Sequence, residues 1–296
     1  MKLMRGRLTL KGLDDGILAS LGRIADKNER SLEAEARYAL SQWVKTHDDN
    51  SESKEDEISS YQTEVTSRLN YILRQHTLIA KGHTSYSLVA EKCGYESPLQ
   101  LENWLRGKDI PSYKELEKLA TYFGVNETWL KNGSATPYNA EYIRISKTPD
   151  AAVEWLTSLQ IDGTSHPIEE LSFVRTANGS LYITKKYQSH KCLCYSTPYV
   201  FSDGIGNSGF RSLQSLFKIW KSLYTFYIKN DIFINSYILN EAQTEQWTES
   251  LTHPLCFLVD ANKSAWWEDV WEDRELHEYW EGCQRLSERV RSANHS

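Results

Sequence analysis

Residues 84–107 read TSYSLVAEKCGYESPLQLENWLRG and decide the fold of the segment around them. Thr84 or Ser85 can begin a first helix, because its hydroxyl accepts a hydrogen bond from a backbone N–H that the first turn leaves free. Gly94 can end that helix, and Ser97 can begin a second one shortly afterwards. The stretch therefore predicts two short helices joined by a tight turn.

Apolar residues at helical spacing continue the pattern on both sides of this pair. One further helix is predicted over residues 61–73, another begins at Ser112, and a last short one covers residues 128–131. A tight turn between two short helices is typical of a helix-turn-helix, whose second helix enters the major groove of DNA. We therefore predict a five-helix domain of this kind over residues 61–136.

Four segments carry a resemblance to a known family. They are LVAEKCG (88–94), NWLRGK (103–108), LEKLA (116–120) and GVNETWL (124–130). In this order they resemble the Xre/Cro-type helix-turn-helix family, over about residues 65–133. The resemblance implies that residues 97–106 form the helix that reads DNA.

The side chains expected to contact DNA in this domain are Ser97, Leu99, Gln100, Asn103, Arg106 and Lys108. Asn and Gln can bridge adenine, Arg prefers guanine, and a Lys after the helix suits a phosphate. Two features depart from the family. The interval from Gly94 to Trp104 is one residue longer than usual, and Pro98 and Leu99 stand where members often carry polar side chains. A helix-turn-helix that serves protein contacts is the alternative.

A smaller module is predicted at the N-terminus. Residues 7–11 alternate polar and apolar side chains, which is the period of a strand with one buried face. Asp14 can cap a first helix that Asn28 ends in a left-handed conformation, and Ser31 can cap a second helix that runs to Val44. One strand and two helices cannot bury a core alone, so we expect the strand to pair with the same strand of a second protomer.

The segments LKGL (10–13) and RSLEAEAR (30–37) resemble the ribbon-helix-helix family of the Arc/MetJ type, and more closely the FitA-type antitoxins, over residues 5–45. The resemblance implies an obligate dimer whose paired strands read bases, with the helix N-terminus at Ser31 on a phosphate. The side chains expected to contact DNA from the strand are Arg5, Arg7, Thr9 and Lys11. A small helical cap on the next domain is the alternative.

Charge is unevenly distributed along the chain. Its 296 residues include 34 Lys and Arg against 40 Asp and Glu, which gives a formal net charge of -6. Residues 137–296 hold 15 basic and 20 acidic side chains, whereas residues 1–12 hold four basic and no acidic ones. The acidic total therefore does not exclude DNA binding by the N-terminal half. Residues 47–60 are predicted to be a solvated acidic linker, with a polar helix as the alternative.

Residues 140–296 predict an α+β domain without a resemblance to a known family. Two apolar segments, 171–174 and 181–185, flank Asn178-Gly179, which indicates a β-hairpin. Further elements are expected as strands at 192–195, 199–201 and 255–259, as a helix at 212–228, and as one or two acidic helices over 266–291. The whole is a multidomain chain, mainly α in its N-terminal half and α+β in its C-terminal domain.

No catalytic or metal site is expected in this domain. His190, Cys192 and Cys194 lack the paired C-x-x-C spacing of zinc sites, and strand cysteines usually pack as small apolar groups. The glycine-rich residues 204–209 lack a Walker lysine, which favours a flexible loop. Because no nucleophile–base pair or carboxylate pair stands out, we expect no enzyme activity, no metal and no cofactor.

The sequence favours a dimeric, sequence-specific DNA-binding transcription regulator, a repressor with two reading modules per protomer. The expected partners are double-stranded operator DNA, palindromic or composite, a second copy of the chain or a higher homo-oligomer, and a protein or small-molecule effector at the C-terminal domain. The alternative is an antitoxin-like autoregulator whose C-terminal half binds a toxin or another protein. We expect a cytoplasmic protein, since no apolar run approaches the roughly 18 residues of a membrane helix. The resemblances imply a regulator of bacterial, phage or plasmid type.

Overall fold

The computed structural model of the chain describes residues 14–48, 54–80, 84–161, 164–187, 191–230, 232–272 and 278–295. The chain divides into two compact units, residues 1–60 and residues 61–296. The strand predicted over residues 7–11 lies outside the described residues, and so do Arg5, Arg7, Thr9 and Lys11. None of the helices in the described ranges combines the length and the apolar character needed to span a membrane.

The first unit contains helices α1 (Asp15–Lys27) and α2 (Leu32–Asp48). Asp14 caps α1, since its carboxylate accepts a hydrogen bond of 2.6 Å from the N–H of Gly16. The prediction that Asn28 is left-handed is wrong, because its φ is -94° and Glu29 has the positive φ of 53°. Asn28 still closes the last turn of α1 through its N–H, and its side chain donates to Glu35 instead.

The helical domain consists of α3 (Lys54–Ile79), of which residues 61–79 belong to the second unit, and of α4 (Tyr86–Lys92), α5 (Pro98–Leu105), α6 (Tyr113–Phe123) and α7 (Glu127–Asn132). Helix α3 begins inside the predicted linker, so residues 54–60 are helical. This is the polar-helix alternative, and the reason is that Glu and Lys are good helix formers. The core of the domain is apolar and includes Ile72, Leu101, Trp104, Leu116 and Leu130.

A mixed six-stranded sheet organises the rest of the second unit, in the order β1-β6-β5-β4-β7-β8. Its strands are β1 (Glu141–Tyr142), β4 (Glu170–Arg175), β5 (Ser180–Tyr187), β6 (Lys191–Val200), β7 (Phe233–Ile238) and β8 (Asn262–Lys263), and a separate pair is formed by β2 (Ser158–Ile161) and β3 (Thr164–Pro167). The hairpin predicted at Asn178-Gly179 joins β4 and β5. The two strands expected at 192–195 and 199–201 fall on one strand, β6, which ends at Val200.

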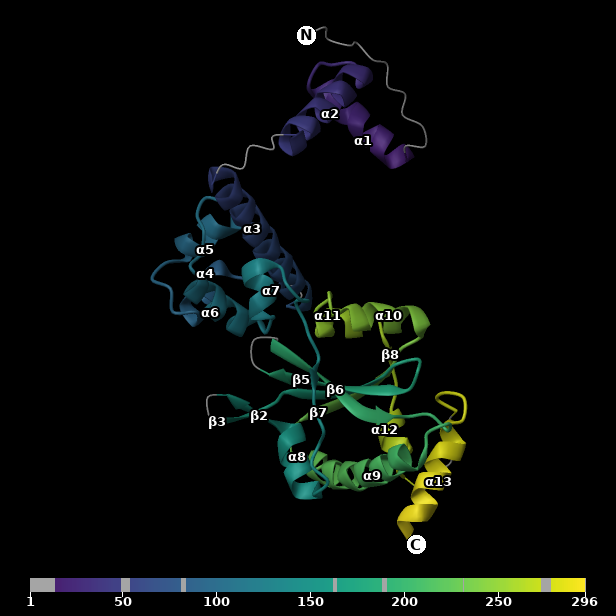
Figure 1. Cartoon of the computed structure of the whole chain (residues 1–296). Helices are drawn as coiled ribbons and strands as arrows, with labels where there is room; N and C mark the ends of the chain where they lie inside the picture. Colours follow the sequence, from purple (N-terminus) through teal and green to yellow (C-terminus); the bar gives the residue numbers. More distant parts are fainter. Residues whose placement is uncertain are drawn as a thin grey trace. The chain divides into compact units, whose positions relative to one another are not determined.

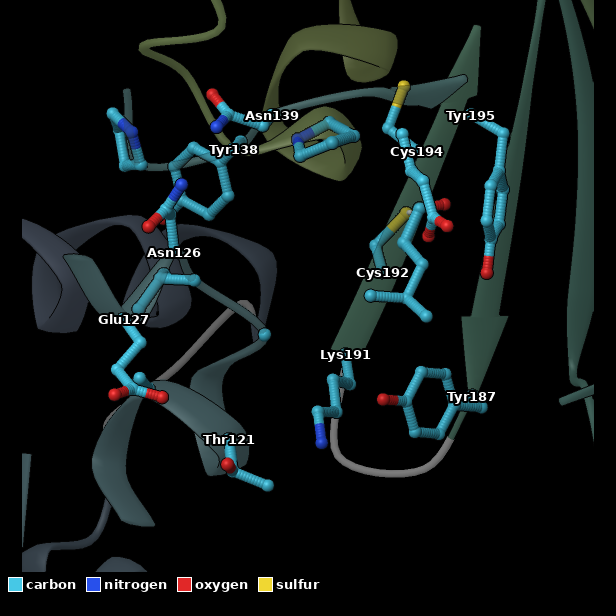
Figure 2. Close-up of a pocket in the computed structure, with 17 residues that line it drawn as sticks. Thr121, Asn126, Glu127, Tyr138, Asn139, Tyr187, Lys191, Cys192, Cys194 and Tyr195 are labelled. Atoms are coloured by element: carbon cyan, nitrogen blue, oxygen red, sulfur yellow. Dashed lines mark hydrogen bonds between the residues drawn. The ribbon is translucent and has the colours of Figure 1, made fainter. Parts of the chain in front are cut away.

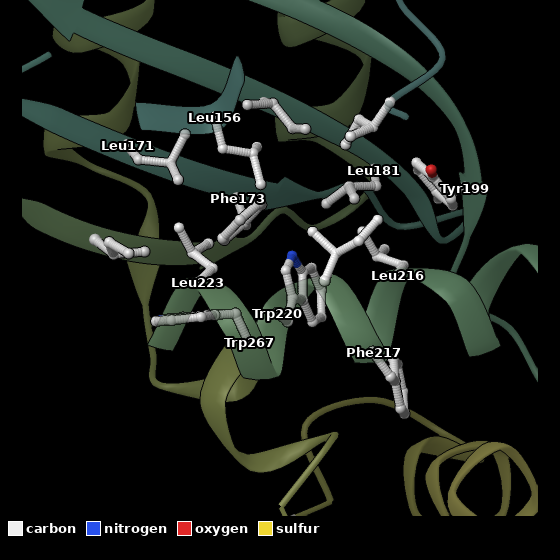
Figure 3. Packing of buried hydrophobic residues seen from close by; sticks show 14 of the residues in the cluster. Leu156, Leu171, Phe173, Leu181, Tyr199, Leu216, Phe217, Trp220, Leu223 and Trp267 are labelled. Carbon is white, nitrogen blue, oxygen red and sulfur yellow. The ribbon is translucent and has the colours of Figure 1, made fainter. Parts of the chain in front are cut away.

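Helices cover both faces of this sheet (Figure 1). One face carries α8 (Pro149–Thr157), α9 (Asn207–Tyr227), α12 (Trp266–Asp269) and α13 (Cys283–His295), and the other carries α10 (Glu241–Glu249) and α11 (Pro254–Val259). Figure 3 shows Trp220 of α9 beneath the sheet, packed near Phe173 and Trp267, whose ring centroids lie 4.9 and 6.2 Å away. Helices on both faces of a sheet bury a core on each side.

Residues 255–259 were expected as a strand and form helix α11 instead. Pro254 stands in the first turn, where its missing N–H costs nothing, and Nδ1 of His253 accepts a hydrogen bond of 3.1 Å from the N–H of Leu255. A short apolar run does not distinguish a buried helix from a buried strand, and here the cap decides.

The helical domain packs directly against the C-terminal domain within the second unit. The Tyr71 hydroxyl donates to the carbonyl of Leu251 at 2.5 Å, and the N–H of His253 donates to Oε1 of Gln75 at 3.3 Å. Helix α3 therefore contacts the loop between α10 and α11, which connects the two domains by specific hydrogen bonds.

Candidate nucleic-acid interface

The turn between α4 and α5 is built around Gly94. Its φ of 68° lies in the left-handed region, which glycine enters without the Cβ strain of other residues. The N–H of Gly94 donates to the carbonyl of Glu91 at 3.0 Å, and the N–H of Tyr95 donates to that of Ala90 at 2.8 Å. These bonds satisfy the last carbonyls of α4 and direct the chain into α5.

Tyr95 fixes this turn to the rest of the domain. Its ring meets that of Trp104 edge to face, with centroids 5.3 Å apart, and its hydroxyl donates to the carbonyl of Glu115 at 3.0 Å. Burial and the nearby Cys93 and Glu115 raise the pKa of Tyr95, so the hydroxyl stays a donor near neutral pH. The residue thus ties the turn to both α5 and α6.

Helix α5 has one buried and one exposed side. Leu101 and Trp104 are almost completely buried, whereas Leu99 is 57% exposed. The exposed side also presents the side chains of Gln100, Asn103 and Arg106, which follow Leu99 at intervals of one, four and seven residues. The structure therefore brings four of the predicted contact residues onto one surface.

The C-terminal end of α5 is held by three side chains of α3. Gln62 Nε2 donates to the carbonyl of Gly107 at 2.9 Å, Thr66 Oγ1 to that of Trp104 at 3.0 Å, and Asn70 Nδ2 to that of Leu105 at 2.8 Å. Carbonyls at a helix end have no partner within the helix, so this α3 stripe caps them. The sequence shows only polar residues at i, i+4 and i+8 on a helix, and their partners become visible in the structure.

Positive charge is scarce on the exposed side of α5. Arg106 forms an ion pair of 2.5 Å with Glu102, one turn earlier in the same helix. Lys108 is exposed, and its N–H donates to the carbonyl of Asn103 at 2.8 Å. A surface of this kind attracts phosphates weakly. Hydrogen bonds to bases would therefore contribute a larger share of any DNA binding than contacts with phosphates.

Two serines serve as helix caps. Ser97 Oγ accepts from the N–H of Leu99 at 3.2 Å, and Ser31 Oγ accepts from the N–H of Ala34 at 3.2 Å. Each cap leaves the N–H of other first-turn residues available, which is the feature that suits a phosphate at a helix N-terminus.

The cysteine side chains of this protein are free thiols with raised pKa values. All five cysteines are free thiols, and burial raises the pKa of Cys194 to about 12 and that of Cys256 to about 11. A protonated thiol is a poor nucleophile and a poor metal ligand. Within the described ranges, which omit His190, no group of three or more His, Cys, Asp or Glu side chains could hold a metal ion.

The family model described as helix-turn-helix matches residues 78–130, which include α4, α5, α6 and most of α7. The match confirms the helix-turn-helix part of the sequence interpretation and supports a DNA-binding transcription regulator. No curated protein and no solved structure matches the chain.

Proposed function

We propose that this protein is a dimeric, sequence-specific transcription repressor that binds operator DNA through two modules per protomer. The observation that carries the proposal is the exposed side of α5 in the matched helix-turn-helix. It presents Gln100, Asn103 and Arg106, whose amide and guanidinium groups are the ones that pair with adenine and guanine in the major groove. The opposite side of α5 is anchored by Leu101 and Trp104, so the reading surface has a rigid support.

The dimer is supported by how little α1 and α2 bury within one chain. Ala25 is the one buried apolar residue among the side chains described in the first unit. Ile17, Ile24 and Trp43 are 56%, 48% and 59% exposed. A helix pair with so small a core needs a partner surface, and a ribbon-helix-helix dimer would supply it from a second copy.

Two weak modules on one chain can produce one strong site. When both engage the same DNA, the second binding step is intramolecular, and the combined affinity exceeds that of either module by about 10²- to 10⁴-fold. This would offset the near balance of acidic and basic side chains in the helix-turn-helix domain. An operator with two kinds of element, arranged symmetrically, is the target that such a protein requires.

Footprinting of the full chain on fragmented genomic DNA tests the proposal. We expect one long protected region that contains two symmetric element types. Protection of a single short element would restrict the function to one module, and the absence of any protected region at physiological salt would refute the proposal.

Replacing Arg7 and Lys11 by alanine tests the strand module. If this strand lies in the groove, operator affinity falls and its dependence on salt becomes shallower, by about one unit of log–log slope per lost phosphate contact. Alanine at Lys218 and Lys221, two exposed lysines of α9, is the matched control for net charge. Unchanged binding of the strand variant would exclude the strand from the interface.

A further inference from the structure

A cavity of about 360 Å³ lies within the second unit, between the helical domain and the sheet. Figure 2 shows Thr121 of α6, Asn126 before α7 and Glu127 of α7 on one side of it. Tyr187 of β5 and Lys191 of β6 lie on the other side. Pockets for small molecules commonly start at about 300 Å³ and often lie where two domains meet. The cavity is therefore large enough for a small organic ligand.

Lys191 is the basic side chain in this cavity. It is partly buried, burial lowers its pKa, and its ammonium lies 5.2 Å from the centre of the Tyr187 ring. Among the residues that the structure describes, none forms an ion pair with it. A desolvated ammonium without a carboxylate partner favours an anion from outside the chain.

The other charged side chains restrict that anion to a single negative charge. Glu127 and Glu141 also line the cavity, and Glu127 already pairs with Lys131. Among the described residues that line the cavity there are two carboxylates and one ammonium, and a phosphorylated ligand would bring two or more negative charges next to them. A monocarboxylate matches the lysine without that repulsion.

The uncharged lining suits a flat, aromatic body. Tyr138, Tyr187 and Tyr195 all contribute to the wall, and such rings favour stacked or edge-on contacts with other rings. Asn126 uses Oδ1 to cap α7, so its Nδ2 group is still available as a donor.

We propose that this cavity binds a small aromatic monocarboxylate, with its carboxylate on Lys191, and that the ligand is an effector of DNA binding. The binding part stands on the cavity alone, whereas the effector part rests on the proposed function. Helix α6 connects the two sites, because it lines the cavity at Thr121 and receives the Tyr95 hydrogen bond at Glu115. A ligand between α6 and β6 would therefore favour one orientation of the helical domain relative to the sheet over others.

The binding part is tested by isothermal titration calorimetry on the full chain without DNA. The probes are 4-hydroxybenzoate, its uncharged methyl ester, and phenyl phosphate as a dianion. We expect one molecule of 4-hydroxybenzoate to bind per chain. The affinity of the methyl ester and that of phenyl phosphate should each be lower by a factor of at least about ten. No binding of 4-hydroxybenzoate at about 10 mM, or tighter binding of phenyl phosphate, would overturn the proposal.

Two variants locate the site. Lys191→Met keeps the length of the side chain and should weaken 4-hydroxybenzoate binding by about 10- to 100-fold, whereas Lys218→Met, at an exposed lysine of α9, should leave it unchanged. Thr121→Trp, at the exposed rim, should block the cavity while keeping Lys191. Full binding by both cavity variants, with unchanged thermal unfolding, would place the ligand elsewhere and refute this site.

The effector part uses the operator found by footprinting. Saturating 4-hydroxybenzoate should change operator affinity by about 5- to 150-fold, and the change should be lost in Lys191→Met. If the probe binds and the chain protects DNA but affinity is unchanged, the effector role is wrong while the proposed function stands. If no DNA is bound at all, the proposed function fails and the calorimetry still decides the binding site.

Discussion

Asn103 lies in the middle of the exposed side of α5, between Leu99 and Arg106. Its amide can bridge the edge of one adenine, a contact that exists at the cognate base and not elsewhere. We expect Asn103→Ala to lower operator affinity by about 10- to 100-fold and to change non-specific affinity little. Competition binding with operator and random DNA measures both.

Lys108 should contact a phosphate, in contrast to the base contact expected of Asn103, because it is an exposed lysine directly after the helix. Lys108→Ala should weaken binding to all DNA alike and make the salt dependence shallower. An equal loss on all DNA for Asn103→Ala would count against base reading by α5.

Lys185 is a buried lysine, 1% exposed, whose ammonium donates to the carbonyls of Trp155 and Ser158. Burial lowers its pKa from 10.5 to about 7. Between these values the unfolded chain binds more protons than the folded one, so the unfolding free energy should rise with pH. The rise from this residue is at most about 1.4 kcal/mol per pH unit and ends above pH 10.5.

Denaturant unfolding of the wild type and Lys185→Met across this pH range measures the effect as a difference. Other groups titrate there as well, and the difference cancels them. The wild type should gain stability relative to the variant as pH rises, and Lys218→Met should run parallel to the wild type. Parallel curves for Lys185→Met would show that Lys185 keeps an ordinary pKa.

At the scale of elements, the α3 stripe of Gln62, Thr66 and Asn70 is what holds the end of α5. Asn70→Ala leaves the carbonyl of Leu105 without this partner and should lower the unfolding free energy by about 1 kcal/mol. It should also weaken operator binding, because α5 becomes less fixed. Ser67→Ala, at an exposed position of α3, is the control, and equal stability of the two variants would mean that the stripe does not support α5.

The elements that could be predicted from the sequence are those with a local cause. The caps at Asp14, Ser85, Ser97 and Ser112 begin helices where expected, since each hydroxyl or carboxylate bonds to an N–H two or three residues later. The β4–β5 hairpin follows from Asn178-Gly179 in the same way. The strand predicted at residues 255–259 was wrong because their apolar run fits a helix or a strand equally well.

At the scale of the whole molecule, the exposed faces of α1 and α2 predict association. Ile17 and Ile24 lie two turns apart on one side of α1 and are about half exposed. Replacing both by aspartate would place charges in the proposed dimer interface and should leave the chain monomeric. Sedimentation velocity of the full chain measures the mass. Arg23→Asp, at an exposed polar position of α1, should stay dimeric, and a dimer in the Ile17/Ile24 variant would exclude this face.

The order of the helices in the reading domain, their caps and the exposed side of α5 were determined by the sequence itself, because each depends on residues within a few positions of one another. The strand order β1-β6-β5-β4-β7-β8, the α3 stripe, the burial of Lys185 and the cavity at Lys191 were decided only by the tertiary structure. The parallel pairs β1–β6 and β4–β7, the α3 stripe and the contacts of Lys185 join residues that stand about thirty to more than sixty positions apart, and the cavity is lined from two domains. The spacing of residues along the chain does not predict such contacts, because they form only when separate elements pack together.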